Sequence, residues 1–164
     1  MVTIRSAVSA DLPQILKFIR GLGEYERLSS QVFATEEALR ATLFGERPYA
    51  EVLIAECDGR PAGFALFFHN YSTFLAQPGV YLEDLFVDPA FRQRGVGTAL
   101  LRYLAQLTLA RGCGRLEWSA LEWNRLAIDF YLRLGAVEMG AWRIYRLTGQ
   151  ALTRTAASAT TPTA

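Results

Sequence analysis

The sequence predicts an α/β domain in which a mixed, mostly antiparallel central sheet carries helices on both faces. Segments with helical spacing of apolar residues alternate with short runs of β-branched and aromatic residues, in the order β-α-α-β-β-β-α-β-α-β. Asp58-Gly59 separates two of these runs and is typical of a tight hairpin. Residues 80–101 lead from a strand through a glycine-containing loop into a long helix. Together these three observations indicate the α/β class.

The composition indicates one globular domain and excludes several classes of protein. Of 164 residues, 51% are hydrophobic and the formal net charge is +1, so we expect a proper core and no nucleic-acid partner. No apolar run reaches transmembrane length, and residues 1–5 lack the layout of a signal peptide, so we expect a cytoplasmic protein that does not bind a membrane. One histidine and two cysteines without metal-ligand spacing predict no metal site.

Five elements are predicted before the glycine loop. They are a strand at 3–5, a helix from Ser9 or Asp11 that loosens at Gly21 and Gly23, a helix from Thr35 to Gly45, a strand at 51–57 and a strand at 61–68. Glu24, Tyr25 and Glu26 are predicted to lie in a loop after the first helix, and residues 77–79 in the turn before the next strand.

The segment from residue 80 to 101 has the features of an anion-binding loop. A strand over 80–87 is ended by Asp88-Pro89, and a helix begins near Thr98. Gly95 and Gly97 permit a tight turn at the helix N-terminus, where unpaired amides favour an anion. Arg92 and Arg94 add charges that suit phosphate oxygens. We therefore predict a pyrophosphate site, with a purely structural turn as the alternative.

After the loop, the chain continues with a helix to about residue 111 and a strand over 115–119. Asn124 then opens a helix, and a final strand is predicted over 142–147. The predicted domain spans residues 1–148. Residues 149–164 are rich in threonine and alanine and are predicted to be a low-complexity tail without a core of its own.

The string V-D-P-x-x-R-x-x-G-x-G-x-x-L-L, placed after a strand, resembles the acetyl-CoA-binding motif of the GNAT N-acetyltransferases. The resemblance covers about residues 3–147. It implies the GNAT fold, with strands four and five splayed around the pantetheine arm, and acetyl-CoA as co-substrate. The residues implied to hold the coenzyme are Leu85, Phe86, Val87, Arg92, Gln93, Arg94, Gly95, Val96, Gly97, Thr98, Asn124 and Tyr131.

Tyr131 has two interpretations. The apolar spacing of its helix alone makes it a core aromatic residue. However, Asn124 followed by a helix with Phe-Tyr-x-x-x-Gly-Ala resembles the second coenzyme motif of the family. The resemblance implies that the Tyr131 hydroxyl protonates the departing thiolate. Such help is needed because free thiols titrate only near pH ~8.5.

Glu83 and Asp84 are candidates for binding and deprotonating a cationic amine. They are neighbours on the strand 80–87, so we expect them to point to opposite faces. The apolar residues around them predict a buried strand, in which a carboxylate needs a partner or a function. We favour Glu83 as the proton acceptor, and an exposed edge position is the alternative. Glu24-Tyr25-Glu26 also has two interpretations: a site that binds a cationic aliphatic amine, or an ordinary solvated turn.

Several segments are most similar to the diamine branch of the family, the spermidine/spermine and thialysine acetyltransferases. These segments are Tyr25-Glu26, 44–48, 81–87, 122–124 with Phe130-Tyr131, and Trp142-Arg143. The resemblance implies an amine site with Tyr25, Glu26, Glu83, Asp84 and Trp142, and a homodimer. The connection from Gly135 to Trp142 is shorter than in the spermidine enzymes, and Arg94 and Leu126 differ in residue type.

The expected function is therefore acetyl-CoA-dependent N-acetylation of a small-molecule amine by direct transfer. The acceptor would be a primary amine of a small polyamine, a diamine or a diamine-like amino acid. Two alternatives remain open from the sequence: transfer to another amino acid or a protein N-terminus, and a non-catalytic coenzyme A-binding sensor.

Overall fold

The computed structural model describes residues 1–157, and residue contacts divide the chain into two compact units, 1–119 and 120–164. The elements of the first unit are β1 (Val2–Ser6), α1 (Leu12–Tyr25), α2 (Glu36–Leu43), β2 (Glu51–Cys57), β3 (Arg60–Ser72), β4 (Gln77–Val87), α3 (Val96–Ala110) and β5 (Leu116–Trp118), with 3-10 turns at Ser9–Asp11, Ser29–Gln31 and Pro89–Phe91. Over the described residues 120–157, the second unit contains α4 (Arg125–Arg133) and α5 (Gly149–Ala157).

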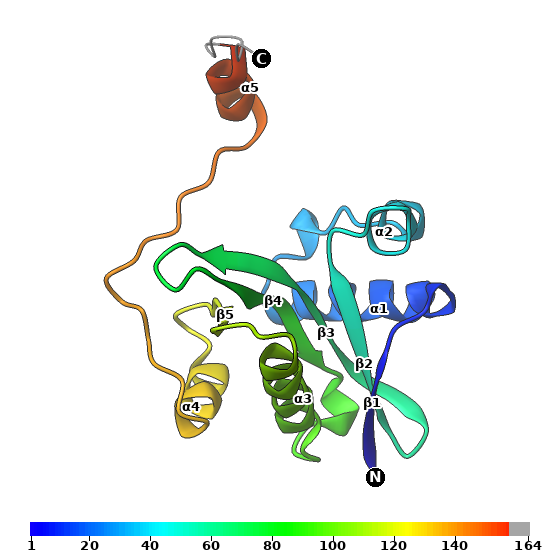
Figure 1. Cartoon of the computed structure of the whole chain (residues 1–164). Coiled ribbons are helices and arrows are strands. Elements are labelled where there is room, and N and C mark those ends of the chain that lie inside the picture. The colour runs from blue at the N-terminus through cyan, green and yellow to red at the C-terminus, as the bar shows by residue number, and fades with distance from the viewer. Residues whose placement is uncertain (158–164) are drawn as a thin grey trace. The chain divides into compact units, whose positions relative to one another are not determined.

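The first unit is built on one five-stranded sheet in the order β1-β2-β3-β4-β5 (Figure 1). The first three pairings are antiparallel, and β4 pairs with β5 in parallel through the crossover helix α3. The hairpin between β2 and β3 turns at Asp58 and Gly59, which both have positive φ, as a tight primed turn requires. The predicted mixed, mostly antiparallel sheet is therefore confirmed.

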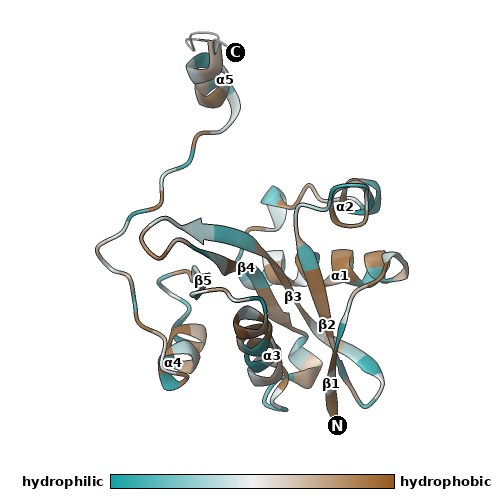
Figure 2. Ribbon diagram, in the orientation of Figure 1, coloured by the Kyte–Doolittle hydropathy of each residue, from teal (hydrophilic) through white to brown (hydrophobic). Residues whose placement is uncertain are grey.

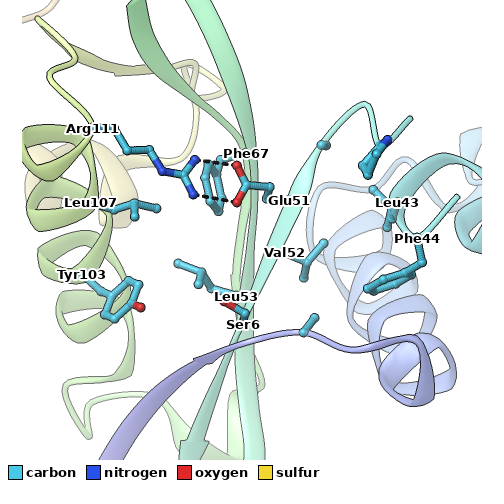
Figure 3. Close-up of a pocket in the computed structure, with 13 residues that line it drawn as sticks. Ser6, Leu43, Phe44, Glu51, Val52, Leu53, Phe67, Tyr103, Leu107 and Arg111 are labelled. Atoms are coloured by element: carbon cyan, nitrogen blue, oxygen red, sulfur yellow. Dashed lines mark hydrogen bonds and ion pairs between the residues drawn. The ribbon is translucent and has the colours of Figure 1, made fainter. Parts of the chain in front are cut away.

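Helices cover both faces of the sheet: α1 and α2 lie on one face and α3 on the other (Figure 3). On the α1 face, Phe18 stacks on Phe64 with ring centroids 5.7 Å apart and also contacts Phe86. On the opposite face, α3 contributes the buried side chains of Leu100 and Leu104. The central parts of β2, β3 and β4 are largely hydrophobic in Figure 2. Burial of these apolar surfaces is the main force that holds the sheet between its helices.

The pairing of β4 with β5 is short, as the predicted splay requires. Only Val80, Tyr81 and Leu82 have partners on β5. From residue 83 to 87, β4 pairs with β3 on one side and has no strand partner on its other side among the described residues. The backbone groups of this edge therefore remain available at the end of β4.

Helix α1 continues through both of its glycines instead of loosening there. It ends at Tyr25, so Glu24 and Tyr25 are helical, and their predicted placement in a loop is wrong. A Cβ on Gly21 would lie 2.8 Å from Cζ of Phe86, so this glycine permits close packing of α1 on β4. The packing outweighs the low helix propensity of glycine.

The turn before β4 lies earlier than predicted. Residues 77–79 belong to β4 and pair with Ser72, Tyr71 and Asn70 of β3, and the turn occupies residues 73–76. Pro78 lies opposite Tyr71 near the beginning of the strand, where a missing backbone donor is tolerated. The Gln-Pro-Gly sequence is a turn signal that the pairing with β3 overrides.

The final strand predicted over 142–147 is not formed, since the structure assigns no strand to these residues. The alternating pattern favours β-structure only when a neighbouring strand and a core face are supplied. Here the side chains are exposed, for example 76% for Ile144 and 87% for Tyr145. Residues 149–157, predicted to be part of a tail, form α5, none of whose residues is buried. The rest of that tail, 158–164, lies outside the described residues.

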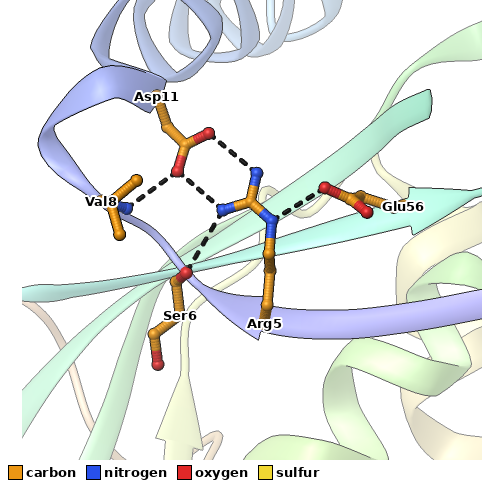
Figure 4. Close-up of polar contacts among 5 residues, drawn as sticks. All are labelled: Arg5, Ser6, Val8, Asp11 and Glu56. Atoms are coloured by element: carbon orange, nitrogen blue, oxygen red, sulfur yellow. Dashed lines mark hydrogen bonds and ion pairs between the residues drawn. The ribbon is translucent and has the colours of Figure 1, made fainter. Parts of the chain in front are cut away.

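Arg5 joins β1, β2 and the first 3-10 turn through two carboxylates (Figure 4). Its Nη1 and Nη2 donate to Asp11 at 2.7 and 2.8 Å, and its Nε donates to Glu56 at 2.8 Å. Asp11 also accepts a hydrogen bond from the backbone N–H of Val8. The hydrogen bond from Arg5 lowers the pKa of Asp11, with a smaller contribution from Val8. This network is structural, because it fixes the first strand to the turn that starts α1.

Within residues 1–157, none of the helices combines the length and the apolar character needed to cross a bilayer.

Candidate active site

The predicted anion site is a loop between the end of β4 and the start of α3. Asp88 accepts a hydrogen bond from the N–H of Ala90 at 2.9 Å and starts the 3-10 turn that follows β4. Gly95, with φ of 80°, is the N-cap of α3, and no described side chain caps this terminus. The first backbone N–H groups of α3 therefore lack a side-chain partner. A helix N-terminus of this kind favours an anion.

Arg92 does not extend freely into solvent. Its guanidinium carbon lies 4.8 Å from the ring centroid of Tyr25, at the end of α1. Its Nε donates to the carbonyl oxygen of Val87, the last residue of β4, at 3.3 Å. No sequence signal indicated this contact, because Tyr25 and Arg92 are far apart in the chain.

Arg94 is directed toward the β2–β3 hairpin. Its Nη1 lies 3.7 Å from Sγ of Cys57 and 4.0 Å from a carboxylate oxygen of Asp58. Its guanidinium carbon also lies 5.8 Å from the ring centroid of Phe91. Both arginines of the loop therefore contact protein groups, and the uncapped amides at the start of α3 are the loop's most direct anion-binding feature.

Two residues predicted for the amine site, Asp84 on β4 and Glu26 at the C-terminus of α1, lie close enough for their charges to interact. Asp84 is opposite Leu66 of β3, and Leu66 packs against the core under α1. Burial raises the pKa of Asp84 to about 6, with further contributions from the charges of Glu83 and Glu26. Burial also raises the pKa of Glu26, which caps the C-terminus of α1. The structure thus brings three carboxylates into electrostatic contact.

Glu83 occupies a β-bulge. Leu82 pairs with Phe67 and Asp84 pairs with Leu66, so Glu83 is the extra residue of β4. Strict alternation therefore does not determine its face, and the reasoning that directed Glu83 and Asp84 to opposite faces does not apply. Glu83 is exposed, whereas Asp84 is half-buried. The more strongly desolvated carboxylate of the pair is Asp84.

Three predicted site residues belong to the second unit. Asn124 caps α4 by accepting a hydrogen bond from the N–H of Ala127 at 3.3 Å. Tyr131 lies in the last turns of this helix, half-buried, with its ring centroid 5.4 Å from that of Phe130. Trp142 follows α4 in the extended segment and is 73% exposed. The predicted start of this helix at Asn124 is confirmed.

A cavity of about 230 Å³ lies away from the predicted anion site, at the edge of the sheet beyond the end of β1 (Figure 3). Arg111, at the C-terminal end of α3, contacts both carboxylate oxygens of Glu51 there, at 2.5 and 2.8 Å. The hydrogen bond from Arg111 lowers the pKa of Glu51. Because the anion site lies at the opposite end of α3, this cavity is not part of it.

Within residues 1–157, no three His, Cys, Asp or Glu side chains are grouped to hold a metal ion. Both cysteines, Cys57 and Cys113, are free and buried.

Comparison with known proteins relates the sequence to a group of acetyltransferases. The chain is 40% identical over 162 residues to a thialysine N-epsilon-acetyltransferase of Bos taurus, which covers 92% of this chain and 95% of the relative. It is 34% identical over 194 residues to an L-ornithine N5-acetyltransferase of Arabidopsis thaliana, covering 91% of this chain and 85% of the relative.

The fold has a counterpart among solved structures. An integron cassette protein from V. cholerae matches with a TM-score of 0.81 and 26% identity, over 96% of this chain and 98% of the other. The sequence model of the acetyltransferase (GNAT) family matches residues 18–136, which include the anion loop and α4. From this match, and from the 40% identity to a curated relative over most of both chains, the chain belongs to the acetyltransferase (GNAT) family and is an N-acetyltransferase.

Proposed function

We propose that this enzyme transfers the acetyl group of acetyl-CoA directly to a primary amine of a small polyamine, a diamine or a diamine-like amino acid. The observation that carries the proposal is the group of carboxylates formed by Glu26, Glu83 and Asp84. A cationic amine is complementary to such a group. The names of the thialysine and ornithine relatives support an amino acid with a side-chain amine.

The residues of the loop and of β4 fit acetyl-CoA. The backbone amides from Arg94 to Thr98 lie at an uncapped helix N-terminus and would hold the pyrophosphate. The edge of β4 at Leu85, Phe86 and Val87 has no strand partner among the described residues and offers backbone groups for the pantetheine arm and the thioester carbonyl, although the Val87 carbonyl oxygen already accepts a hydrogen bond from Arg92. Acetyl-CoA supplies an activated acyl group when bound.

The carboxylates of Glu83 and Asp84 would bind the ammonium form of the acceptor and take its proton, directly or through water. The pKa of about 6 for Asp84 suits a group that is ionised at neutral pH and still basic enough to accept a proton. We therefore extend the role expected of Glu83 to the pair formed by Glu83 and Asp84. The free amine would then attack the thioester without an acyl-enzyme.

Tyr131 would protonate the thiolate that leaves, and Asn124 and Trp142 would complete the coenzyme and amine sites. These roles rest on the resemblance of the α4 segment and of Trp142-Arg143 to the diamine branch. The same resemblance supports a homodimer, which light scattering on the purified protein would detect by its mass.

The first experiment is acetyl-CoA-dependent release of free thiol with a panel of acceptors. The panel contains S-aminoethylcysteine, ornithine, lysine, putrescine, spermidine and a short peptide. Release with a small diamine or a diamine-like amino acid is expected. Release with the peptide alone would contradict the proposal. Binding of acetyl-CoA without release on any acceptor would favour a sensor.

Two variants test the carboxylates in the same assay. Glu83→Gln should raise the KM for a dicationic acceptor, because it removes a charge of the proposed amine site. Glu37→Gln, which removes an exposed carboxylate on α2, is the matched control and should leave this KM unchanged. Equal KM values for wild type and Glu83→Gln would remove Glu83 from the amine site.

A further inference from the structure

Arg92 links the predicted coenzyme loop to two elements of the proposed amine site. Its guanidinium carbon lies 4.8 Å from the centre of the Tyr25 ring, at the last residue of α1. Its Nε donates to the carbonyl oxygen of Val87, at the last residue of β4. β4 also carries Asp84, so one side chain contacts the ends of both elements that hold proposed amine-binding residues.

These contacts use part of the Arg92 guanidinium for protein groups instead of for a phosphate. Bidentate binding of a phosphate uses two adjacent N–H groups of the guanidinium fork. In the structure, Nε is bonded to Val87 and the guanidinium lies over the Tyr25 ring, so only the Nη1 and Nη2 pair is left for a phosphate. A cation over an aromatic ring is attracted by the ring even at exposed sites. Arg92 is exposed, but this attraction and the bond to Val87 restrain its side chain.

The backbone around Arg92 makes such a restraint useful. Gln93 and Gly95 both have positive φ, 62° and 80°, so the loop adopts a conformation that is unfavourable for ordinary residues. Contacts of the Arg92 side chain with α1 and β4 restrict the loop from its N-terminal side. A ligand that orders either the loop or Tyr25 would therefore also favour the ordered form of the other.

We propose that Arg92 is a positioning residue that couples amine binding at Tyr25 to the order of the coenzyme loop. The proposal rests on the proposed function, since it takes Tyr25 as part of the amine site. The pyrophosphate is then held by the amides at the start of α3, and the guanidinium of Arg92 acts through Tyr25 and Val87.

A double-mutant cycle on the full chain tests the coupling. The four proteins are wild type, Arg92→Gln, Tyr25→Leu and the double variant. For each, the KM and kcat for the best amine are measured at saturating acetyl-CoA, and the Kd of acetyl-CoA alone is measured by calorimetry. Arg92→Gln should raise the amine KM about two- to fivefold, as loss of a cation–π contact predicts. Its kcat should change less than about twofold, and the acetyl-CoA Kd should rise by at most the same two- to fivefold, because Arg92 also restrains the coenzyme loop.

The double variant should have the same amine KM as Tyr25→Leu, because Arg92 acts on the amine only through that ring. Tyr25→Phe retains the aromatic ring, so Arg92→Gln should raise the amine KM by the same factor in the Tyr25→Phe protein as in the wild type. This comparison replaces the cycle if Tyr25→Leu does not fold. Arg60→Gln is the matched control. It removes an arginine that lies 5.2 Å from the ring of Phe91, on the hairpin side of the same loop, and should not change the amine KM.

Two results would overturn the proposal. The first is a tenfold or larger rise in the acetyl-CoA Kd of Arg92→Gln without amine, which would make Arg92 a phosphate ligand. The second is independent, multiplying effects of Arg92→Gln and Tyr25→Leu on the amine KM. Failure of the wild type to acetylate any amine would instead contradict the proposed function, and the acetyl-CoA Kd would still separate a phosphate ligand from a positioning residue.

Discussion

Asp84 is half-buried on β4 beside Glu83 and Glu26, and its pKa is raised to about 6 by burial and by these charges. The same surroundings have opposite effects on function and on stability. An ionised carboxylate held at this pKa is a competent base at neutral pH. Its burial in the charged form also costs free energy that the fold must supply elsewhere.

Asp84→Asn should therefore lower activity. In the wild type, kcat/KM should fall as the pH decreases through about 6, where the carboxylate becomes protonated. In the variant this acidic limb should be absent, and kcat should be lower by about 10²-fold or more. A pH–rate profile of both proteins is the measurement, and a wild-type limb that persists in the variant would assign it to another group.

The same variant should be more stable than the wild type at neutral pH. The folded pKa of about 6 exceeds the ordinary value of 3.8, so ionisation of Asp84 destabilises the fold increasingly between these values and fully above 6. Asp84→Asn should add on the order of 1–3 kcal/mol to the free energy of unfolding at pH 7. Urea titrations should detect little difference below pH 3.8, where both side chains are neutral.

Tyr131→Phe tests the proposed acid in the second unit. Loss of the hydroxyl should lower kcat by at least about tenfold while the Kd of acetyl-CoA stays nearly constant. Stopped assays of thiol release and calorimetric titration measure the two quantities. A variant with wild-type kcat would exclude Tyr131 from proton transfer.

The individual candidate residues came from sequence motifs, but their surroundings did not. Tyr25, Glu26, Glu83 and Asp84 were all recognised as candidates, whereas the bulge at Glu83 depends on the pairing of β4 with β3. A one-residue offset of this kind leaves no signal in the composition of either strand. For the same reason, the choice between Glu83 and Asp84 as the more desolvated carboxylate required the structure.

At the scale of single elements, the N-terminus of α3 is the clearest example of agreement. The sequence predicted a helix start near Thr98 after two glycines, and α3 begins two residues earlier, at Val96, with Gly95 as its left-handed cap and Gly97 inside the helix. Helix α1 shows the opposite case. Its glycines indicated a loose end, but close contact of Gly21 with Phe86 keeps the helix intact to Tyr25. Contact between distant segments cannot be derived from local propensity.

Gly95→Ala should weaken both the fold and the coenzyme site. No atom lies within 4 Å of a Cβ built at this position, so the cost comes from the positive φ of 80° and should be about 1–2 kcal/mol of stability. Gly59→Ala is the matched control, with φ of 75° and equally open space in the β2–β3 turn. Both should lower Tm similarly, and only Gly95→Ala should raise the Kd of acetyl-CoA. If Gly95→Ala and the wild type bound acetyl-CoA with equal Kd, the turn at Gly95 would not be part of the coenzyme site.

Asp11→Asn tests the ion pairs that join β1 and β2 to the first turn. The pKa of Asp11 is lowered by Arg5, so the ionised form stabilises the fold above its ordinary pKa of 3.8, and this contribution is lost as the pH falls through the folded pKa. The variant should lose about 1 kcal/mol at pH 7, since Arg5 is partly exposed. Chemical denaturation should give nearly equal stabilities near pH 2. If Asp11→Asn lowered the free energy of unfolding equally at pH 7 and near pH 2, the cause would be an effect other than the charge of Asp11.

At the scale of the whole molecule, the order of elements and the sheet topology followed from alternating periodicities, a hairpin signal and a family motif. The strand predicted over 142–147 was wrong. An alternating pattern indicates that a segment can form a strand, but it does not show whether a neighbouring strand is present to pair with it. Likewise, α5 was not predicted, because the threonine- and alanine-rich composition of residues 149–164 is typical of a low-complexity tail.

Deletion of residues 149–164 tests the predicted domain boundary. None of the residues in α5 is buried, so its removal should change Tm by less than about 2 °C and leave kcat/KM unchanged. Scanning calorimetry and the thiol-release assay are the measurements. A large fall in Tm would place residues of the deleted segment within the folded domain.

The short pairing of β4 with β5 has a consequence for handling the protein. Beyond Leu82, β4 has no strand partner on one side among the described residues, and an open strand edge is a template on which other chains can add. A coenzyme lying along that edge would occupy the same backbone groups. Solutions of the ligand-free enzyme should therefore become turbid on warming sooner than solutions that contain coenzyme A, so purification and storage with the coenzyme would protect the enzyme from self-association.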